Sequence, residues 1–356
     1  MLAVRMAGLT KFERLTLALV AVLTALAGVG DYDTWPAVPR FALATLALAG
    51  LAWMVSFGTE QVGERFGPGV TGVMQSTLGN LPELFVVVFA LKAGELVVAQ
   101  TAIVGSVLAN ALLVLGLVIV VGARRAPDGV MRFSHRLPND TATLLLATVF
   151  IIVLLGLSLS SHDSASHHVE AISIVGAVCL LVVYITWLVP YLRADTRSGE
   201  AAHPRISLRL ALVILAAAGA GAAFVSDWFI GAVQPTIAVV GFSKPFVGLV
   251  IVAIAGNAVE NAVGLILANK GSSDLAISVV KNSVAQIAAF LFPALVLISL
   301  LLSTHLTFSL APVYIGALAL MAVIVRQVTG DGEAEAFEGW ALVALYVVVG
   351  TVALFE

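Results

Sequence analysis

Two glutamates lie within long apolar stretches of this sequence, and each follows an asparagine by three residues. Glu83 ends the segment GNLPE at 79–83, and Glu260 ends the segment GNAVE at 256–260. A charged carboxylate in the centre of a bilayer is costly, so an acidic residue there is a functional candidate by default. Because hard cations prefer oxygen ligands, the pair predicts a site for a divalent cation.

The same pair predicts proton binding. Without a metal ion, two neighbouring carboxylates in a low-dielectric medium cannot both stay charged, so at least one takes up a proton. Cation and proton would then compete for the oxygens of Glu83 and Glu260, and this competition is the physical basis of antiport. Asn80 and Asn257 lie on roughly the same helix faces as the glutamates, and their side-chain oxygens would complete the coordination shell.

Helix-loosening and polar residues surround both motifs. Breaks in the helices would free backbone carbonyls as further ligands, and they are predicted at Gly79, Pro82 and Gly256. The next span of each half offers polar groups at similar depth, namely Ser106, Ser283 and Gln286. Helix packing is the alternative role for the serines, asparagines and glutamine. For the glutamates, the alternative is a structural hydrogen bond from a protonated carboxyl.

A repeat relates the two motifs. The glutamates are 177 residues apart (260 − 83), and the same offset relates Ser106 to Ser283. Glu83 lies in the third predicted span and Glu260 in the eighth, an odd offset of five spans, so the second half is expected to enter the membrane upside down. Inverted repeats of this kind are a recurrent architecture of secondary transporters, with the site near the midplane.

The elements that must position these residues are membrane helices. The chain has 356 residues, of which only 11% are charged, whereas soluble domains carry roughly 25%. Its apolar runs are continuous and about as long as a bilayer is thick, which indicates helices and not barrel strands. The predicted spans are 15–29, 41–57, 70–91, 96–121, 141–160, 169–191, 208–229, 246–268, 275–302, 306–325 and 340–355.

The expected fold is therefore an all-α integral membrane protein of about eleven transmembrane helices. Residues 1–35 form an extra N-terminal helix, 36–195 a first repeat of five helices, and 196–356 a second, inverted-topology repeat of five. Basic residues precede the first span and gather in the loops after the fourth and sixth. The N-terminus of this multi-pass protein is thus predicted to be cytoplasmic and the C-terminus outside.

Other classes of function are less well supported. A single cysteine, Cys179, allows no intramolecular disulfide, and no basic block indicates nucleic acid. No hydrolytic triad, zinc motif or phosphate-binding glycine loop indicates an enzyme or a cofactor. A cation channel stays an alternative, although channels more often form rings in an oligomer. Two groups of loop residues are interpreted as solvated, namely His162, Asp163, His167, His168 and Glu170, and Asp331, Glu333, Glu335 and Glu338.

Segments 79–116 and 256–288 resemble the two alpha repeats of the calcium/proton exchanger (CAX-type) family, within the calcium/cation antiporter superfamily. The resemblance implies that Glu83 and Glu260 bind calcium and exchange protons, and that the second and seventh spans slide to give alternating access. Calcium is then a transported ion and not a cofactor, proton and membrane lipid are the other partners, and a homo-oligomer is compatible with the sequence.

The chain departs from the family pattern at three positions. Asn261 stands where the family usually has histidine, and Lys281 and Asn282 replace an apolar residue and a glycine before Ser283. These changes leave manganese or sodium as alternative cations. Lys281 is expected either to tune the site as a tethered cation or to make a structural or snorkelling contact near the cytoplasmic end of its span.

Overall fold

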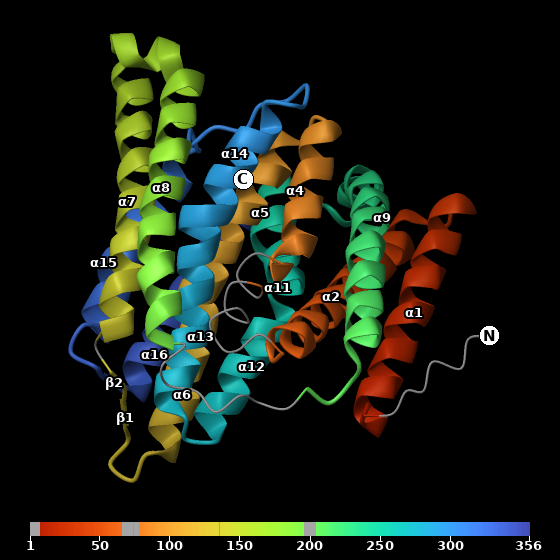
Figure 1. Cartoon of the computed structure of the whole chain (residues 1–356). Coiled ribbons are helices and arrows are strands. Elements are labelled where there is room, and N and C mark those ends of the chain that lie inside the picture. The colour runs from red at the N-terminus through yellow and green to blue at the C-terminus, as the bar shows by residue number, and fades with distance from the viewer. Residues whose placement is uncertain (1–7, 66–73, 75–77, 135, 196–203) are drawn as a thin grey trace. The chain divides into compact units, whose positions relative to one another are not determined.

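The chain is almost entirely helical, as the apolar runs predict (Figure 1). The computed structural model describes residues 8–65, 74, 78–134, 136–195 and 204–356. These residues form two compact units, one of 1–89 with 185–242 and the other of 90–184 with 243–356. Each unit therefore draws on both halves of the sequence.

The first unit is built on three long helices. They are α1 (Lys11–Tyr32), α2 (Ala37–Gly63) and α9 (Leu208–Val240), joined by most of α4 (Leu81–Lys92). α2 packs along α9, where the rings of Phe41 and Phe229 lie 4.9 Å apart. Thr10 and Glu13 form a capping box at the start of α1, which satisfies amide groups that the first turn leaves free.

One predicted end in this unit was wrong. The seventh span was expected to end at Phe229, but α9 continues to Val240 with Pro235 inside it. Proline is tolerated within membrane helices because the neighbouring structure satisfies the freed backbone group. The helix then ends at Gly241, whose φ of 79° is a left-handed conformation that glycine adopts readily.

The second unit holds the remaining elements. Its first part contains α5 (Leu96–Leu108), η1 (Ala109–Val114), α6 (Leu115–Arg125), β1 (Val130–Arg132), α7 (Arg136–Ser161), η2 (Ser164–His168) and most of α8 (Val169–Asp195). Its second part contains α10 (Lys244–Phe246), η3 (Val247–Val252), α11 (Ala253–Gly256), α12 (Ala258–Asn269), α13 (Ser273–Gln286), η4 (Ile287–Leu291), α14 (Phe292–Ser299), α15 (Pro312–Thr329), β2 (Glu333–Glu335) and α16 (Ala336–Phe355).

Three of these segments, η1, η3 and η4, are π-helical. Each is continuous with α-helix on both sides, so each is a wide turn inside a longer helix. Such segments are rare and often occur at functional sites. η1 begins three residues after Ser106 and η4 four residues after Ser283, so two of them lie at nearly the repeat offset.

Glycines allow two helices of this unit to approach closely. A Cβ on Gly105 of α5 would lie 2.4 Å from the Leu249 carbonyl oxygen in η3, and one on Gly248 would lie 2.1 Å from the Thr101 hydroxyl. Real Cβ atoms do not come so near to backbone atoms. The absence of side chains at these two positions therefore sets the spacing between α5 and η3.

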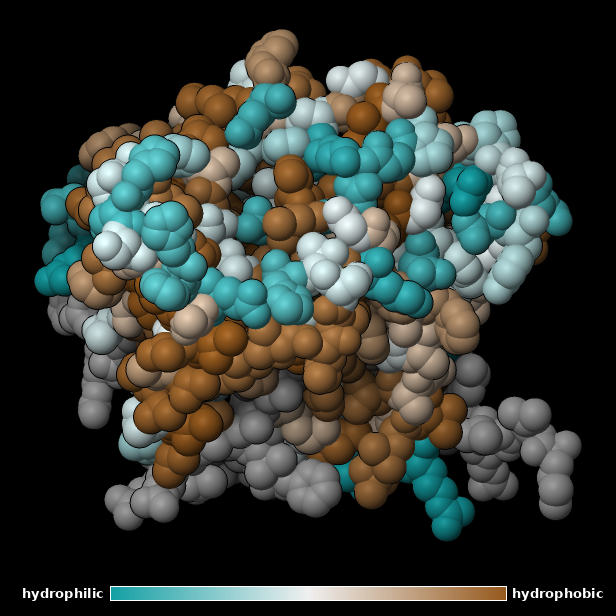
Figure 2. All heavy atoms as spheres, turned by 90° about the horizontal axis from the view of Figure 1, so that it is seen from above, coloured by the Kyte–Doolittle hydropathy of each residue, from teal (hydrophilic) through white to brown (hydrophobic). Residues whose placement is uncertain are grey.

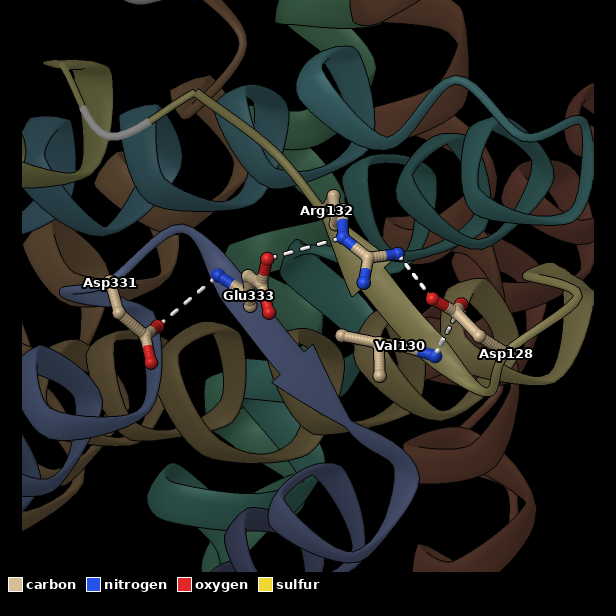
Figure 3. A network of polar contacts seen from close by, with 5 residues as sticks. All are labelled: Asp128, Val130, Arg132, Asp331 and Glu333. Atoms are coloured by element: carbon tan, nitrogen blue, oxygen red, sulfur yellow. Dashed lines mark hydrogen bonds and ion pairs between the residues drawn. The ribbon is translucent and has the colours of Figure 1, made fainter.

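Loops predicted as irregular contain a short antiparallel ribbon of β1 and β2, in which Met131 lies opposite Ala334. Arg132 joins its strands, because its guanidinium lies 3.1 Å from Glu333 and 2.6 Å from Asp128 (Figure 3). All four acidic residues interpreted as a solvated turn have partners here. Asp331 accepts from the Glu333 amide at 3.1 Å, and Glu335 and Glu338 form a capping box for α16.

The structure confirms that most of the predicted spans are apolar helices of membrane-crossing length. Nine helices of the described ranges are long and apolar enough to cross a membrane, or ten if the bent pair 244–256 and 261–269 is one span. The predicted third span, 70–91, falls partly outside the described residues, so the number eleven stays a prediction.

Large apolar side chains face outward on α7 and α8, such as Phe150, which is 66% exposed. Figure 2 shows hydrophilic residues on one face of the molecule, among hydrophobic ones.

Candidate cation site

Both sequence motifs lie where a helix begins. Gly79 and Asn80 form a turn directly before α4, and Asn257 forms the turn between α11 and α12. The carbonyl of Asn80 accepts the first helical bond of α4 from Leu84 at 2.9 Å, and that of Asn257 accepts from Asn261 at 3.0 Å. Each asparagine is therefore the residue at which a helix starts.

This start places the glutamates in equivalent positions. Glu83 is the third residue of α4, and Glu260 is the third residue of α12. The first turn of a helix carries partial positive charge from its free N–H groups, so it stabilises a charged carboxylate. The side chain of Glu260 lies outside the described part of the structure.

The first motif is buried. Asn80 is 3% exposed and Glu83 is 4% exposed, although both side chains are polar. Pro82 occupies the first turn of α4, where its missing N–H costs no helical bond. A buried carboxyl is stable only when it is neutral or when groups of opposite charge or hydrogen-bond donors surround it. Glu83 thus has the burial that coupled binding of a cation or a proton needs.

The second motif takes part in a buried amide network within the second unit. Asn257 is 1% exposed, and its Nδ2 donates to Ser106 Oγ at 3.0 Å and to the Ala253 carbonyl at 2.9 Å. Its Oδ1 accepts from Asn110 Nδ2 at 2.8 Å. The structure therefore brings together two of the predicted ligands, Asn257 and Ser106, from helices that are distant in the sequence.

Asn110 is a buried polar residue that was not among the predicted ligands. It is fully buried in η1, and besides Asn257 it contacts the Ser106 carbonyl at 3.1 Å. Its own Oδ1 has no hydrogen-bond partner among the residues that the structure describes. The available signal was its place four residues after Ser106, on the same helix face.

The remaining predicted ligands lie on α13. Ser283 is 2% exposed, and Gln286, the last residue of the helix, is half-buried. α13 packs against η1 and α7 of the same unit. Ser283 and Gln286 thus lie on a helix that contacts the element carrying Asn110.

Lys281 makes a structural contact. It is 5% exposed, and its Nζ donates to Thr329 Oγ1 at 2.6 Å. Thr329 is the last residue of α15 and itself donates to the Val325 carbonyl. A cation near the C-terminal end of a helix interacts favourably with the free carbonyls there. The structural alternative for Lys281 therefore has a specific partner.

The loop histidines and acidic residues form no metal centre in the described part of the chain, where no group of three metal-binding side chains occurs. His305 Nδ1 lies 3.1 Å from Glu170, and both side chains are exposed. Asp163 caps η2 by accepting from the amides of Ala165 and Ser166. A hydrogen bond from Ser158 lowers the pKa of Asp163. Local hydrogen bonds therefore give the Asp163 carboxylate a structural role at the start of η2.

Together these features define a helical, multi-pass integral membrane protein with polar residues buried at helix breaks. The sequence model of the family described as sodium/calcium exchanger protein matches residues 37–191 and 210–355, so the chain belongs to that family. This confirms the family resemblance drawn from the two motifs.

Similar proteins with known names support this family assignment. The chain is 32% identical to a vacuolar calcium ion transporter of Schizosaccharomyces pombe, over 93% of this chain and 82% of that protein. It is 28% identical to the Ca2+/H+ antiporter ChaA of Bacillus subtilis, over 95% and 98%. The solved structure of native YfkE matches with a TM-score of 0.81 at 27% identity, over 96% of this chain and all of that one. The H+/Ca2+ exchanger CAX, at 14% identity and a TM-score of 0.73, shows the shared fold.

Proposed function

We propose that this protein is a secondary active antiporter that exchanges calcium for protons across a membrane. The observation that carries the proposal is the buried carboxyl of Glu83 in the first turn after a helix break, in a motif repeated at Glu260. The family, and relatives named as Ca2+/H+ antiporters, support the same function. An enzymatic activity is not part of the proposal.

The chemistry of exchange follows from the energetics of burial. Calcium bound by Glu83 and Glu260 neutralises both carboxylates, and amide and hydroxyl oxygens add ligands of the kind that calcium prefers. When calcium leaves, a bare carboxylate in a water-poor interior is costly, so protonation replaces the lost charge. Calcium and protons therefore occupy the site in turn, which couples their opposite fluxes.

The polar neighbours have separate roles in this proposal. Asn80, Asn257, Ser106, Ser283 and Gln286 supply oxygen ligands to calcium. Asn110 orients the Asn257 amide through the bond to its Oδ1. The predicted helix-loosening residues Gly79, Pro82 and Gly256 lie at or beside these helix ends, where backbone carbonyls have room to take part.

Alternating access requires one part of the protein to move. We assign the movement to the second and seventh spans, which are α2 and α9. These helices pack together within one compact unit, as a pair that slides together would. Interfaces between packed helices allow such small sliding motions on ligand binding.

The membrane topology belongs to the same proposal. It has an extra N-terminal helix and two inverted repeats of five, with the N-terminus cytoplasmic and the C-terminus outside. The recurrence of a π-helical segment after Ser106 and after Ser283 supports the repeat. The distribution of basic loop residues supports the orientation.

The test is calcium uptake into proteoliposomes with and without an imposed pH gradient, with manganese and sodium measured in parallel. Uptake driven by the proton gradient, and lost in Glu83→Gln, is the expected result, whereas the exposed Glu170→Gln should transport normally. Calcium leak without coupling to protons would indicate a channel. Coupled movement of manganese or sodium in place of calcium would replace the substrate.

A further inference from the structure

In each π-helical segment one backbone carbonyl loses its α-helical donor, and in η3 and η4 a side chain of another helix bonds to that carbonyl. In η3, the Ala253 N–H bonds to the carbonyls of Gly248 and Val250, and thereby passes over Leu249. In an α-helix, the amide of Ala253 would bond to Leu249, four residues earlier. The wide turn therefore exposes the Leu249 carbonyl to the side of the helix.

In η4 the carbonyl of Ala288 also loses its helical donor, and for two reasons. The Phe292 N–H bonds back to Ile287, five residues earlier. The next residue, Pro293, has no N–H to give. The Ala288 carbonyl thus has neither an α-helical nor a π-helical donor.

A side-chain hydroxyl from another helix forms a hydrogen bond with each of these carbonyls. Tyr346 of α16 donates to the Leu249 oxygen at 3.2 Å. Thr148 of α7 lies 3.1 Å from the Ala288 oxygen and 3.2 Å from the Leu144 oxygen of its own helix. Both side chains are buried, Tyr346 at 5% and Thr148 at 2% exposure. In a membrane interior no water replaces such a donor without cost.

The two segments are also placed where they control the site. Leu249 lies eight residues before Asn257, and Ala288 lies two residues after Gln286. A π-turn contains one extra residue, so its conversion to α-helix would rotate the helix on one side by about 100° relative to the other. Such a rotation would turn the predicted ligands away from the site.

We propose that Tyr346 and Thr148 are positioning residues for ion binding. Each stabilises a π-turn by bonding the carbonyl that the turn exposes, and so fixes the direction in which the adjoining helix presents its polar side chains. Neither residue touches the ion. This inference rests on the proposed exchange at the site that includes Asn257 and Gln286.

The test separates the hydroxyls from the bulk of the side chains. Tyr346→Phe and Thr148→Val remove one hydroxyl each and keep the size of the side chain. Calcium KM and maximal rate are measured in proteoliposomes, together with the thermal stability of the purified protein. We expect KM to rise by roughly tenfold in each variant, with a smaller change in maximal rate, since a buried carbonyl loses its partner.

Matched controls exist within the same unit. Thr148→Ser keeps a hydroxyl and should restore KM. Tyr314→Phe removes a buried tyrosine hydroxyl that bonds to Glu356 outside any π-turn, and it should leave KM unchanged. If Tyr346→Phe does not fold, the comparison of Thr148→Val with Thr148→Ser decides the question.

Glu83→Gln keeps failure of this inference distinct from failure of the proposed function. Normal transport by Glu83→Gln would remove the site itself. An inactive Glu83→Gln beside Tyr346→Phe and Thr148→Val of unchanged KM would overturn the positioning role alone. A KM that rises equally in Tyr314→Phe would also overturn it.

Discussion

Two spans of the second unit, α5–η1–α6 and α13–η4–α14, have nearly the same backbone and different side chains. Both pass from α-helix into a π-turn and back. In the first, the Leu115 N–H bonds to Asn110 and Leu112, and so passes over Ala111. The carbonyl passed over in the second belongs to Ala288, at the repeat offset of 177 residues from Ala111. The backbone irregularity thus recurs at the predicted repeat offset.

The side chains at equivalent positions differ in polarity. Asn110 of the first span corresponds to Ile287 of the second, and Lys281 of the second corresponds to Val104 of the first. Gly105 corresponds to Asn282. The two spans therefore widen at equivalent positions. The bond to Asn257 is made only by the first of these two spans, and the bond to Thr329 only by the second. Substitutions that exchange these differences test which of them matter.

The largest effect on folding is expected at Gly105. Gly105→Ala would place its Cβ 2.4 Å from the Leu249 oxygen and 2.5 Å from the Leu249 Cα, which are backbone atoms. Because backbone cannot turn aside as a side chain can, we expect a loss of about 1–3 kcal/mol or more in stability. Thermal unfolding of the purified protein measures it. Asn282→Ala, the equivalent position, is the control, and equal stability of the two variants would contradict the steric argument.

The next effect is on ion binding and is expected at Asn110. Asn110→Ile copies the second span and leaves Asn257 Oδ1 without the donor that it has at 2.8 Å. An unpartnered buried acceptor costs about 1–3 kcal/mol, which corresponds to a roughly tenfold or larger rise in calcium KM if the orientation of Asn257 is lost.

Two further variants separate polarity from volume at this position. Asn110→Ala removes the amide without adding bulk and should change KM in the same direction. Ile287→Val, on the equivalent turn, should transport normally. An unchanged KM in Asn110→Ala would show that the amide network does not support the site.

A smaller effect is expected where Lys281 meets Thr329. Thr329→Val removes this acceptor from a buried amine, while Lys281→Met removes the amine and keeps much of the side-chain volume. Leaving a buried polar group without its partner costs more than removing the group. We therefore expect Thr329→Val to be the less stable by about 1–2 kcal/mol in thermal or denaturant unfolding.

The double variant sharpens this comparison. Lys281→Met with Thr329→Val should recover most of the stability that Thr329→Val loses, because no buried amine then lacks an acceptor. Val104 shows that an apolar side chain is accepted at the equivalent position. Additive losses in the double variant would mean that the two residues act independently.

Hydropathy predicted the spans well where an apolar run alone defines a helix. The predicted span 141–160 agrees with the candidate span Thr141–Ser161, and 340–355 lies within α16. Hydropathy predicted helix ends less well where a helix continues through a residue that usually breaks helices, as α9 does through Pro235. The short ribbon was missed because its strands are far apart in the sequence and only three residues long.

The candidate site was predictable in its residue types and not in its contacts. Spacing identified Asn257 and Ser106, since each recurs at the repeat offset. The bond between Asn110 and Asn257 joins residues 147 positions apart and depends on how α5 and η3 pack. The π-turns depend on a shift in backbone hydrogen bonding, which apolar side chains do not signal. Periodicity therefore finds candidate ligands better than it finds the groups that contact them.

The smallest effect is expected in the ribbon, where the two spans also differ. β1 follows α6, whereas residues 300–311 after α14 contain no strand. The hydrogen bond from Arg132 lowers the pKa of Asp128, which lies at the surface. Exposed ion pairs contribute little to stability, so Asp128→Asn should lower the thermal midpoint only slightly at neutral pH.

The sign of the pH dependence follows from the lowered pKa. A carboxyl with a lower pKa in the folded state adds stability above its unfolded pKa and loses that stability as the pH falls through the folded value. The difference in thermal midpoint between the wild type and Asp128→Asn should therefore be present at neutral pH and vanish on acidification. Arg132→Gln should make the difference smaller at neutral pH, because the main group that lowers the pKa of Asp128 is gone and only the backbone hydrogen bond from Val130 stays. A difference that grows on acidification would show that Asp128 is stabilised as the neutral acid, and that Arg132 is not its main partner.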